Sequence, residues 1–217
     1  QLGDKPFVRI HVNLEEILQK AYDYTALRVP EITHFEGAAT SDPVPVEPYT
    51  HMLQKTVEFF GGQEYGRFRF VTKYNDLDSL IEAEHNGHTE IRFSLNTEHV
   101  IKDYEHHTAS AKLRIEAAGK VAAARYPIGF LIAPVFIYDG WKDDYQRLLE
   151  ELKSVLPEKL CKPVMFEIIS HRYTQKAKSR ILEIYPETTI DMNDESRSFK
   201  YGQFGYGKYV YTKEQLS

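Results

Sequence analysis

Apolar residues along this chain recur with a period of two in some segments and near 3.6 in others, the spacings of strands and helices. Strand-like patterns occupy residues 7–12, 32–37, 67–72, 90–95, 128–133 and 164–169. A helical pattern follows each of them, including residues 110–125 and 175–184. Six strand–helix units in succession predict an α/β fold, a parallel sheet with helices outside that curls into an open or closed barrel.

A doubly wound flat sheet is the competing arrangement for the same alternation. No G-x-G-x-x-G motif follows the first strand-like segment, which argues against a dinucleotide-binding version of that fold. We therefore expect the barrel.

Two helices carry specific expectations. Asn13 and Glu16 have the spacing of a capping box at the start of the first helix. The residues expected on its buried stripe are Leu14, Ile17, Leu18 and Ala21. The residues expected on one face of the second helix are Tyr49, Met52, Leu53, Val57 and Phe60.

The strand-like segments alternate apolar with polar residues, whereas fully buried parallel strands are usually apolar throughout. Phe68 and Phe70 alternate with arginines, and Phe93 stands between Arg92 and Ser94. One face of the sheet is therefore expected to be polar, and buried polar groups need partners. A polar ligand or a wet cavity would supply them; a solvated sheet edge is the alternative.

Polar residues also gather where the strands are expected to end, which is where barrel enzymes place their chemistry. These are Glu36 with residues 40–42, Thr72 with Lys73, Ser94 with Asn96, Ala133 with Pro134, and residues 170–172. Each alone suits a turn, a helix cap or a surface position. Together they predict a functional rim.

The amino-acid composition restricts how this chain can contact nucleic acid. The 217 residues carry 32 acids and 27 bases, a net charge of -5, so any nucleic-acid contact is local rather than general. Two stretches suit such a contact: the basic run Arg172, Lys176, Lys178 and Arg180, and the glycine- and tyrosine-rich segment 201–211. From composition alone, the favoured explanation is a solvated basic helix beside a glycine-punctuated hairpin that closes the sheet.

The single cysteine, Cys161, excludes an internal disulfide framework and an all-cysteine metal site made by this chain alone. No apolar run approaches the roughly 20 residues that span a bilayer, so we expect no membrane contact. The chain begins at Gln1 without a secretory pattern. We therefore expect a segment of a longer cytoplasmic protein, and a processed terminus explains the start at Gln1 equally well. We also expect a monomer.

Seven segments, in order along nearly the whole chain, resemble the spore photoproduct lyase family of radical S-adenosylmethionine DNA-repair enzymes. They are residues 6–18, 35–42, 70–73, 93–96, 129–134, 166–174 and 201–209. The resemblance implies a partial (β/α)6 TIM-like barrel as the core, residues 1–195, and a glycine- and aromatic-rich C-terminal hairpin, residues 196–217, packed on it.

The resemblance also implies a reaction. A 4Fe-4S cluster, reduced by a separate reductant, cleaves S-adenosylmethionine, and the radical abstracts hydrogen from a thymine dimer in DNA that contains adjacent thymines. The dimer is then converted back to two thymines. A damaged base leaves the duplex stack easily, so the lesion can reach the barrel.

Specific residues follow from the same resemblance. Ser41, Lys73, Ser94 and Ala133 lie where the family handles S-adenosylmethionine, and Lys73 or Ser41 can meet its carboxylate. On the substrate side the resemblance points to Asp42, Tyr201, Gln203 and Phe204.

Three departures from the family pattern affect these expectations. The cluster-binding C-x-x-x-C-x-x-C loop is expected before Gln1, and Cys161 cannot replace it, so no metal ligand is expected in this chain. The hydrogen-donating cysteine of the family aligns with Ala39, whose methyl group cannot act as a thiol. The Arg-Tyr pair set against the lesion is replaced by Gln203 and Phe204, which allows a different lesion or substrate.

Two other functions remain open. A divergent or catalytically impaired relative could bind nucleic acid or another substrate without turnover. Alternatively, an unrelated barrel aldolase could use Lys73 as a Schiff-base nucleophile at a strand end.

Overall fold

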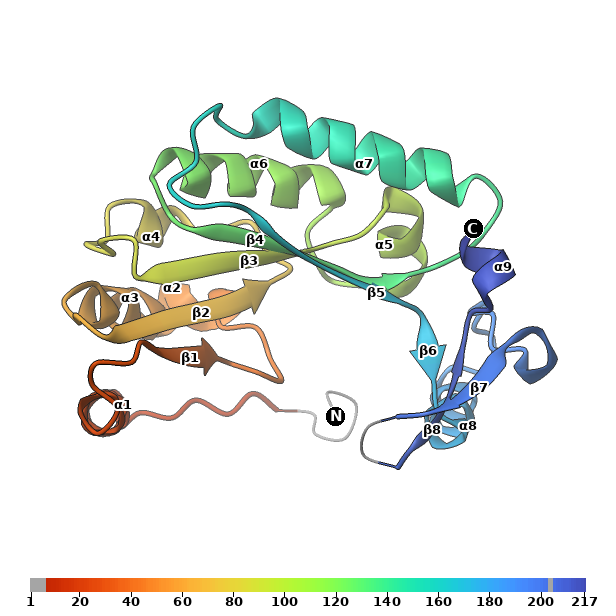
Figure 1. The fold of residues 1–217 in the computed structure, drawn as a ribbon, viewed down its shortest axis with the longest axis horizontal. Helices are drawn as coiled ribbons and strands as arrows, with labels where there is room; N and C mark the ends of the chain where they lie inside the picture. Colours follow the sequence, from red (N-terminus) through yellow and green to blue (C-terminus); the bar gives the residue numbers. More distant parts are fainter. Residues whose placement is uncertain (1–6, 203–204) are drawn as a thin grey trace.

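The structure is a computed structural model that describes residues 7–202 and 205–217. Its main sheet contains five parallel strands in the sequential order β1-β2-β3-β4-β5 (Figure 1). The strands are β1 (Thr33–Gly37), β2 (Gly66–Thr72), β3 (Thr89–Leu95), β4 (Ile128–Val135) and β5 (Met165–Ser170). Sequential order has no switch point, which a doubly wound sheet would need, and the sheet curls into an open half-barrel.

Helices connect the strands and pack outside the sheet (Figure 1). They are α1 (Leu14–Ala26), the short η2 (Val44–Val46), α2 (Glu47–Thr50), α3 (Met52–Gly61), α4 (Asp78–Ile81), α5 (Glu98–Tyr104), α6 (Ala111–Ala123) and α7 (Trp141–Val155). Ser110 and Thr97 cap α6 and α5 through their hydroxyl groups, which accept main-chain N–H groups three residues on.

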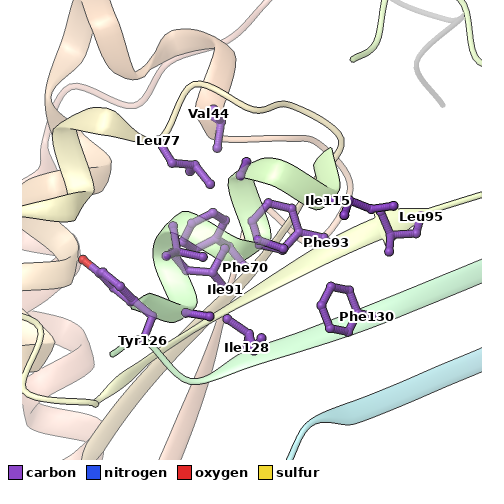
Figure 2. Close-up of a cluster of buried hydrophobic side chains, with 14 of the residues drawn as sticks. Val44, Phe70, Leu77, Ile91, Phe93, Leu95, Ile115, Tyr126, Ile128 and Phe130 are labelled. Atoms are coloured by element: carbon purple, nitrogen blue, oxygen red, sulfur yellow. The ribbon is translucent and has the colours of Figure 1, made fainter. Parts of the chain in front are cut away.

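The hydrophobic core lies between these helices and the outer face of the sheet. Phe70, Phe93 and Phe130 come from β2, β3 and β4 and are fully buried, and Ile115 of α6 packs over them (Figure 2). Close packing of such large side chains provides most of the apolar burial that stabilises the barrel.

The C-terminal part forms a second, antiparallel sheet with the order β6-β8-β7. Its elements are β6 (Arg172–Tyr173), α8 (Gln175–Ile184), η3 (Asp194–Ser196), β7 (Ser198–Tyr201), β8 (Gly207–Val210) and α9 (Lys213–Leu216). It lies beyond the carboxyl ends of the barrel strands (Figure 1). The expected hairpin consists of β7 and β8, and β6 extends it to a three-stranded sheet. The expected division of the chain into two domains after residue 195 stays a prediction.

The sequence prediction was wrong in three places. Residues 7–12 form no strand, and within residues 7–202 and 205–217 no strand pairs with them; Val8 and Val12 are exposed. The main sheet therefore has five strands here rather than six.

The second error concerns the first helix. Asn13 makes no cap hydrogen bond and instead donates to the Glu16 side chain, at 2.9 Å, and Ile17 is exposed.

The third error concerns the second helix. His51 adopts a left-handed conformation, with φ of 51°, and separates α2 from α3. Tyr49 lies before this break and is 86% exposed, whereas Leu53, Val57 and Phe60 follow it and are buried as predicted. A break in the helix changes the phase of its faces, so the stripe cannot continue through it.

Candidate functional site

The inner face of the half-barrel is polar, as the alternation predicted. Glu36 of β1 accepts a hydrogen bond from Arg69 Nε of β2 at 2.5 Å and also pairs with Arg92 of β3. Arg92 in turn lies 3.7 Å from Glu167 of β5. Charged groups on β1, β2, β3 and β5 therefore pair with one another across this wall, which removes part of the need for a ligand there.

Gly129 on β4 leaves room for this network. A Cβ atom at this position would lie 2.8 Å from Glu90 Oε1 and 3.1 Å from Arg92 Cγ. Because glycine has no side chain, Arg92 can cross the wall toward Glu167.

The predicted rim residues lie together at the carboxyl ends of the strands. Parallel pairing aligns Gly37 with Phe70, Thr72 with Phe93, and Leu95 with Ile132, so the four ends share one edge. Ala39 and Ser41 follow β1 in an exposed turn, closed by a 2.9 Å hydrogen bond from the Ser41 amide to the carbonyl of Ala38. Their position suits contact with a ligand above the edge.

Asp42 fastens this turn to the end of β2. Its Oδ2 accepts hydrogen bonds from the Thr72 hydroxyl at 3.0 Å and from the Lys73 amide at 2.8 Å, and its Oδ1 accepts from the Val44 amide at 3.1 Å. Burial raises the pKa of Asp42 above its ordinary value, and the bonds from Lys73, Val44 and Thr72 oppose that shift. The carboxylate thus holds the loop that carries Ser41.

Lys73 and Ser94 are connected through two residues that the sequence did not single out. Lys73 Nζ lies 2.9 Å from Glu105 Oε1, and Arg114 lies 2.8 Å from Glu105 Oε2. Arg114 also donates to the Ser94 carbonyl at 2.9 Å. A signal for Arg114 was available, because it falls among Ala111, Ile115 and Ala118 on the apolar face of its helix.

Ser94 and Ala133 complete the edge. Ser94 is buried, on the same face as Arg92, and its hydroxyl has no hydrogen-bond partner among the residues the structure describes. Asn96, which is fully buried, donates to the carbonyl of Pro134 at 2.8 Å and so ties the end of β3 to the segment containing Ala133. The four positions predicted for the cofactor, Ser41, Lys73, Ser94 and Ala133, therefore lie at the same edge of the sheet.

Comparison with known proteins identifies the family of this chain. A family model described as spore photoproduct lyase matches residues 1–217. The chain belongs to the spore photoproduct lyase family.

Individual relatives agree with this assignment. Spore photoproduct lyases of Clostridium acetobutylicum and Bacillus subtilis are 53% and 45% identical over 214 residues. Those 214 residues are 99% of this chain but 63% of each relative, so the chain spans less than two thirds of their length.

Solved structures of the family share the fold. A double mutant of spore photoproduct lyase with bound S-adenosylmethionine and dinucleoside spore photoproduct is 46% identical, with a TM-score of 0.89 over 99% of this chain and 63% of that one. A complex with dinucleoside spore photoproduct gives the same TM-score at 45% identity and the same coverage. A cobalamin-dependent S-adenosylmethionine radical enzyme, 14% identical, shares only the fold, with a TM-score of 0.53 over 92% of this chain and 34% of its own.

The residues of this chain do not fit an iron–sulfur cluster. Cys161 is the only cysteine in the sequence and is exposed, whereas such clusters are held by several thiolates. Within the described part of the chain, no group of three His, Cys, Asp or Glu side chains could hold a metal ion.

The polar groups of S-adenosylmethionine, in contrast to a cluster, match side chains at this edge. Its carboxylate and hydroxyl groups suit the part-exposed ammonium of Lys73 and the unpartnered hydroxyl of Ser94. Lys73 and Ser94 therefore offer two polar donors at this edge.

The C-terminal sheet presents exposed rings. Tyr201 is 78% exposed, its ring centroid lies 5.3 Å from that of Phe199, and Gln203 and Phe204 lie outside the described residues. The basic run is partly neutralised, because Lys178 pairs with Asp194 at 2.9 Å.

A buried cluster fastens this sheet to the barrel. Arg197 lies 3.5 Å from the ring centroid of Tyr211 and donates to the His171 carbonyl at 3.2 Å. Tyr211 accepts from the amide of Ile137 at 3.1 Å. Burial, and secondly the charge of Arg197, lower the pKa of His171 to about 4. His171 was predicted as a rim residue, and it is buried in this joint.

Among the helices of the described residues, none has the length and apolar character needed to cross a membrane.

Proposed function

We propose that this chain is the barrel portion of a radical S-adenosylmethionine lyase that repairs the thymine dimer spore photoproduct in DNA. The observation that carries the proposal is the continuous set of polar contacts that joins the Ser41 loop, Lys73 and Ser94 at one edge of the half-barrel. The relatives' names give the reaction class, and one solved relative holds both S-adenosylmethionine and dinucleoside spore photoproduct.

The chain's own residues would bind and orient the cofactor. Lys73 and Ser41 would meet the carboxylate of S-adenosylmethionine, and the Ser94 hydroxyl would bind a second polar group. Ala133 would leave space beside them, since its side chain is a single methyl group. When bound, S-adenosylmethionine supplies the hydrogen-abstracting chemistry of this class.

A 4Fe-4S cluster would have to take its cysteine ligands from sequence outside residues 1–217. Such a cluster needs several thiolate ligands, and this chain has one cysteine. A separate reductant would serve that cluster.

The substrate side would combine the rim with the C-terminal sheet. Asp42 would act by holding the Ser41 loop, and Tyr201 would offer an exposed ring to an unstacked base. Gln203 and Phe204 would keep ring stacking while losing the guanidinium and phenol of the family pattern. Ala39 cannot return a hydrogen atom as a thiol does, so the donor would be another group.

The biological partner would be DNA that contains adjacent thymines, bound in the cytoplasm by a monomer. A local basic and aromatic surface on an acidic protein predicts binding that weakens steeply with salt. Gel filtration measures the oligomeric state, and fluorescence anisotropy with a lesion-containing oligonucleotide at several salt concentrations measures the binding.

The decisive experiment uses the longer natural protein, reconstituted anaerobically with iron and sulfide. We expect 5′-deoxyadenosine and recovered thymidine from dinucleoside spore photoproduct. If a properly loaded cluster forms and neither product appears, the proposed function is wrong.

A binding function without turnover is the second candidate, and Ala39 is the observation that favours it, because the chain lacks the thiol at that position. Salt-sensitive DNA binding without cleavage of S-adenosylmethionine would support this candidate. The aldolase alternative is weakened by the ion pair that engages Lys73 with Glu105. Borohydride trapping of a carbonyl substrate on Lys73 would revive it.

A further inference from the structure

We propose that Glu105 and Arg114 are positioning residues for the S-adenosylmethionine site. The guanidinium of Arg114 pairs with the carboxylate of Glu105, which in turn pairs with the ammonium of Lys73. The guanidinium of Arg114 also donates a hydrogen bond to the main chain of Ser94. The inference rests on the proposed function, because Lys73 and Ser94 are cofactor ligands only under that proposal.

The contacts form one continuous set. The two oxygens of Glu105 are divided between two cations, with Oε2 2.8 Å from Arg114 and Oε1 2.9 Å from Lys73 Nζ. Arg114 donates from Nε to the Ala109 carbonyl at 2.8 Å and from Nη2 to the Thr108 hydroxyl at 2.7 Å. Its remaining amino group reaches the Ser94 carbonyl, so Arg114 bonds to both ends of the proposed site.

Burial increases from the rim inward. The side chain of Lys73 is 36% exposed, that of Glu105 is 7% exposed and that of Arg114 is not exposed at all. Lys73 is therefore the member that can meet a ligand, while Glu105 and Arg114 cannot reach one. An ammonium has three donors, and the contact with Glu105 uses one, which leaves the others for a carboxylate.

The need for such an anchor follows from the chemistry of lysine. A lysine side chain has many rotamers, and ordering it on ligand binding costs conformational entropy. An ion pair with a buried carboxylate restricts the ammonium before the ligand arrives, so less entropy is lost on binding.

Glu105 is the C-cap residue of α5, a helix that follows β3 in the chain (Figure 1). The Ala109 amide, four residues on, donates to the Lys73 carbonyl at 3.2 Å, so the same loop contacts both the main chain and the side chain of Lys73. The loop after α5 is thus joined to the end of β2.

The test is a double-mutant cycle on the full chain, with S-adenosylmethionine as the probe in titration calorimetry. We expect Glu105→Gln to weaken binding about tenfold, an effect typical of losing one charged contact. In a Lys73→Met background the same substitution should have no further effect, because Glu105 acts through Lys73. An equal loss in both backgrounds would overturn the inference.

A second measurement does not depend on the cofactor. Acetic anhydride labelling, read by mass spectrometry, should modify Lys73 faster in Glu105→Gln than in the wild type, because the amine is released. Glu105→Asp keeps an anion beside Arg114 but shortens the reach to Lys73, so it tests the same point if Glu105→Gln does not fold. Unchanged labelling of Lys73 in a folded variant would contradict the inference.

Glu47→Gln is the matched control. Glu47 is a buried glutamate whose oxygens accept from the amides of Leu53 and Gln54 at 2.7 and 3.0 Å, away from Lys73. It should alter neither Lys73 labelling nor affinity. Absence of binding by the wild-type chain would instead contradict the proposed cofactor site, and the labelling of Lys73 would then decide by itself whether Glu105 positions it.

Discussion

Asp42 and Thr72, thirty residues apart in the sequence, are joined by a 3.0 Å hydrogen bond from the Thr72 hydroxyl to Asp42 Oδ2. This bond attaches the loop after β1 to the end of β2. The loop carries Ser41, so its position depends on the Asp42 carboxylate.

Replacing Asp42 by alanine should therefore destabilise the protein. The change leaves the Thr72 hydroxyl and the amides of Lys73 and Val44 without their acceptor. We expect this loss to lower the free energy of unfolding by about 2 kcal/mol. Urea unfolding followed by circular dichroism measures it. Asp42→Asn, which keeps one oxygen, should cost less, and equal losses for the two variants would show that the hydrogen bonds are not the cause.

His171 should make stability depend on pH. Its folded-state pKa is about 4, below the ordinary value of 6.5, so the unfolded chain binds the proton first as the pH falls. The stability due to neutral His171 is complete above pH 6.5 and is lost between pH 6.5 and 4. By pH 5 the loss should be about 2 kcal/mol.

The variant His171→Phe keeps an aromatic ring beside Phe136 and removes the titration. The free energy of unfolding, measured at pH 7 and pH 5, should fall less in this variant than in the wild type. The lowered pKa values of His34 and His85 are common to both proteins, so they cancel in the comparison. Parallel pH profiles would rule out His171 as the group responsible.

The stability of the charged inner wall should depend on Glu36. Glu36→Gln removes the nearest anion from Arg92, whose side chain is 11% exposed, and leaves only Glu167 at 3.7 Å. We expect a loss of about 2 kcal/mol in the free energy of unfolding, because a largely buried cation loses its partner.

The matched control for Glu36 is Glu31→Gln, which breaks the exposed pair with Arg28. That change should lower the free energy of unfolding by about 0.5 kcal/mol or less. Similar losses for the two variants would mean that the inner-wall pair behaves as a surface pair.

Tyr211 should control the attachment of the C-terminal sheet. Tyr211→Leu removes the ring beneath Arg197 and the acceptor of the Ile137 amide. Hydrogen exchange should accelerate in β7 and β8 and stay unchanged in β3, because the barrel core does not include this ring. Tyr211→Phe, which keeps the ring, should show a smaller effect. Uniform acceleration throughout the chain would contradict a local joint.

Hydrophobic periodicity was sufficient for most of the fold. The strands β2 to β5 and the helices α6 and α8 lie where the sequence predicted them, because alternating and 3.6-residue patterns follow directly from which face is buried. Residues 7–12 show the limit of this reasoning. They alternate like a strand, but a strand also needs a neighbour to pair with, and no pattern within the segment can specify one.

The helix α5 was missed for a related reason. Its seven residues are too few to establish a period, although Thr97 provides a cap at its start. The break at His51 was missed because a positive φ is uncommon for any residue other than glycine, so a histidine by itself does not predict one.

The sequence by itself determined the polar strand ends and, through the resemblance, the positions Ser41, Lys73 and Ser94. Only the tertiary structure decided how they are held. Glu105 and Arg114 come from separate elements. Their side chains meet because the loop between α5 and α6 bonds to the end of β2, and α6 contacts β3. Ion pairs and hydrogen bonds act over about 3 Å, so they depend on the packing of distant segments, which local periodicity does not encode.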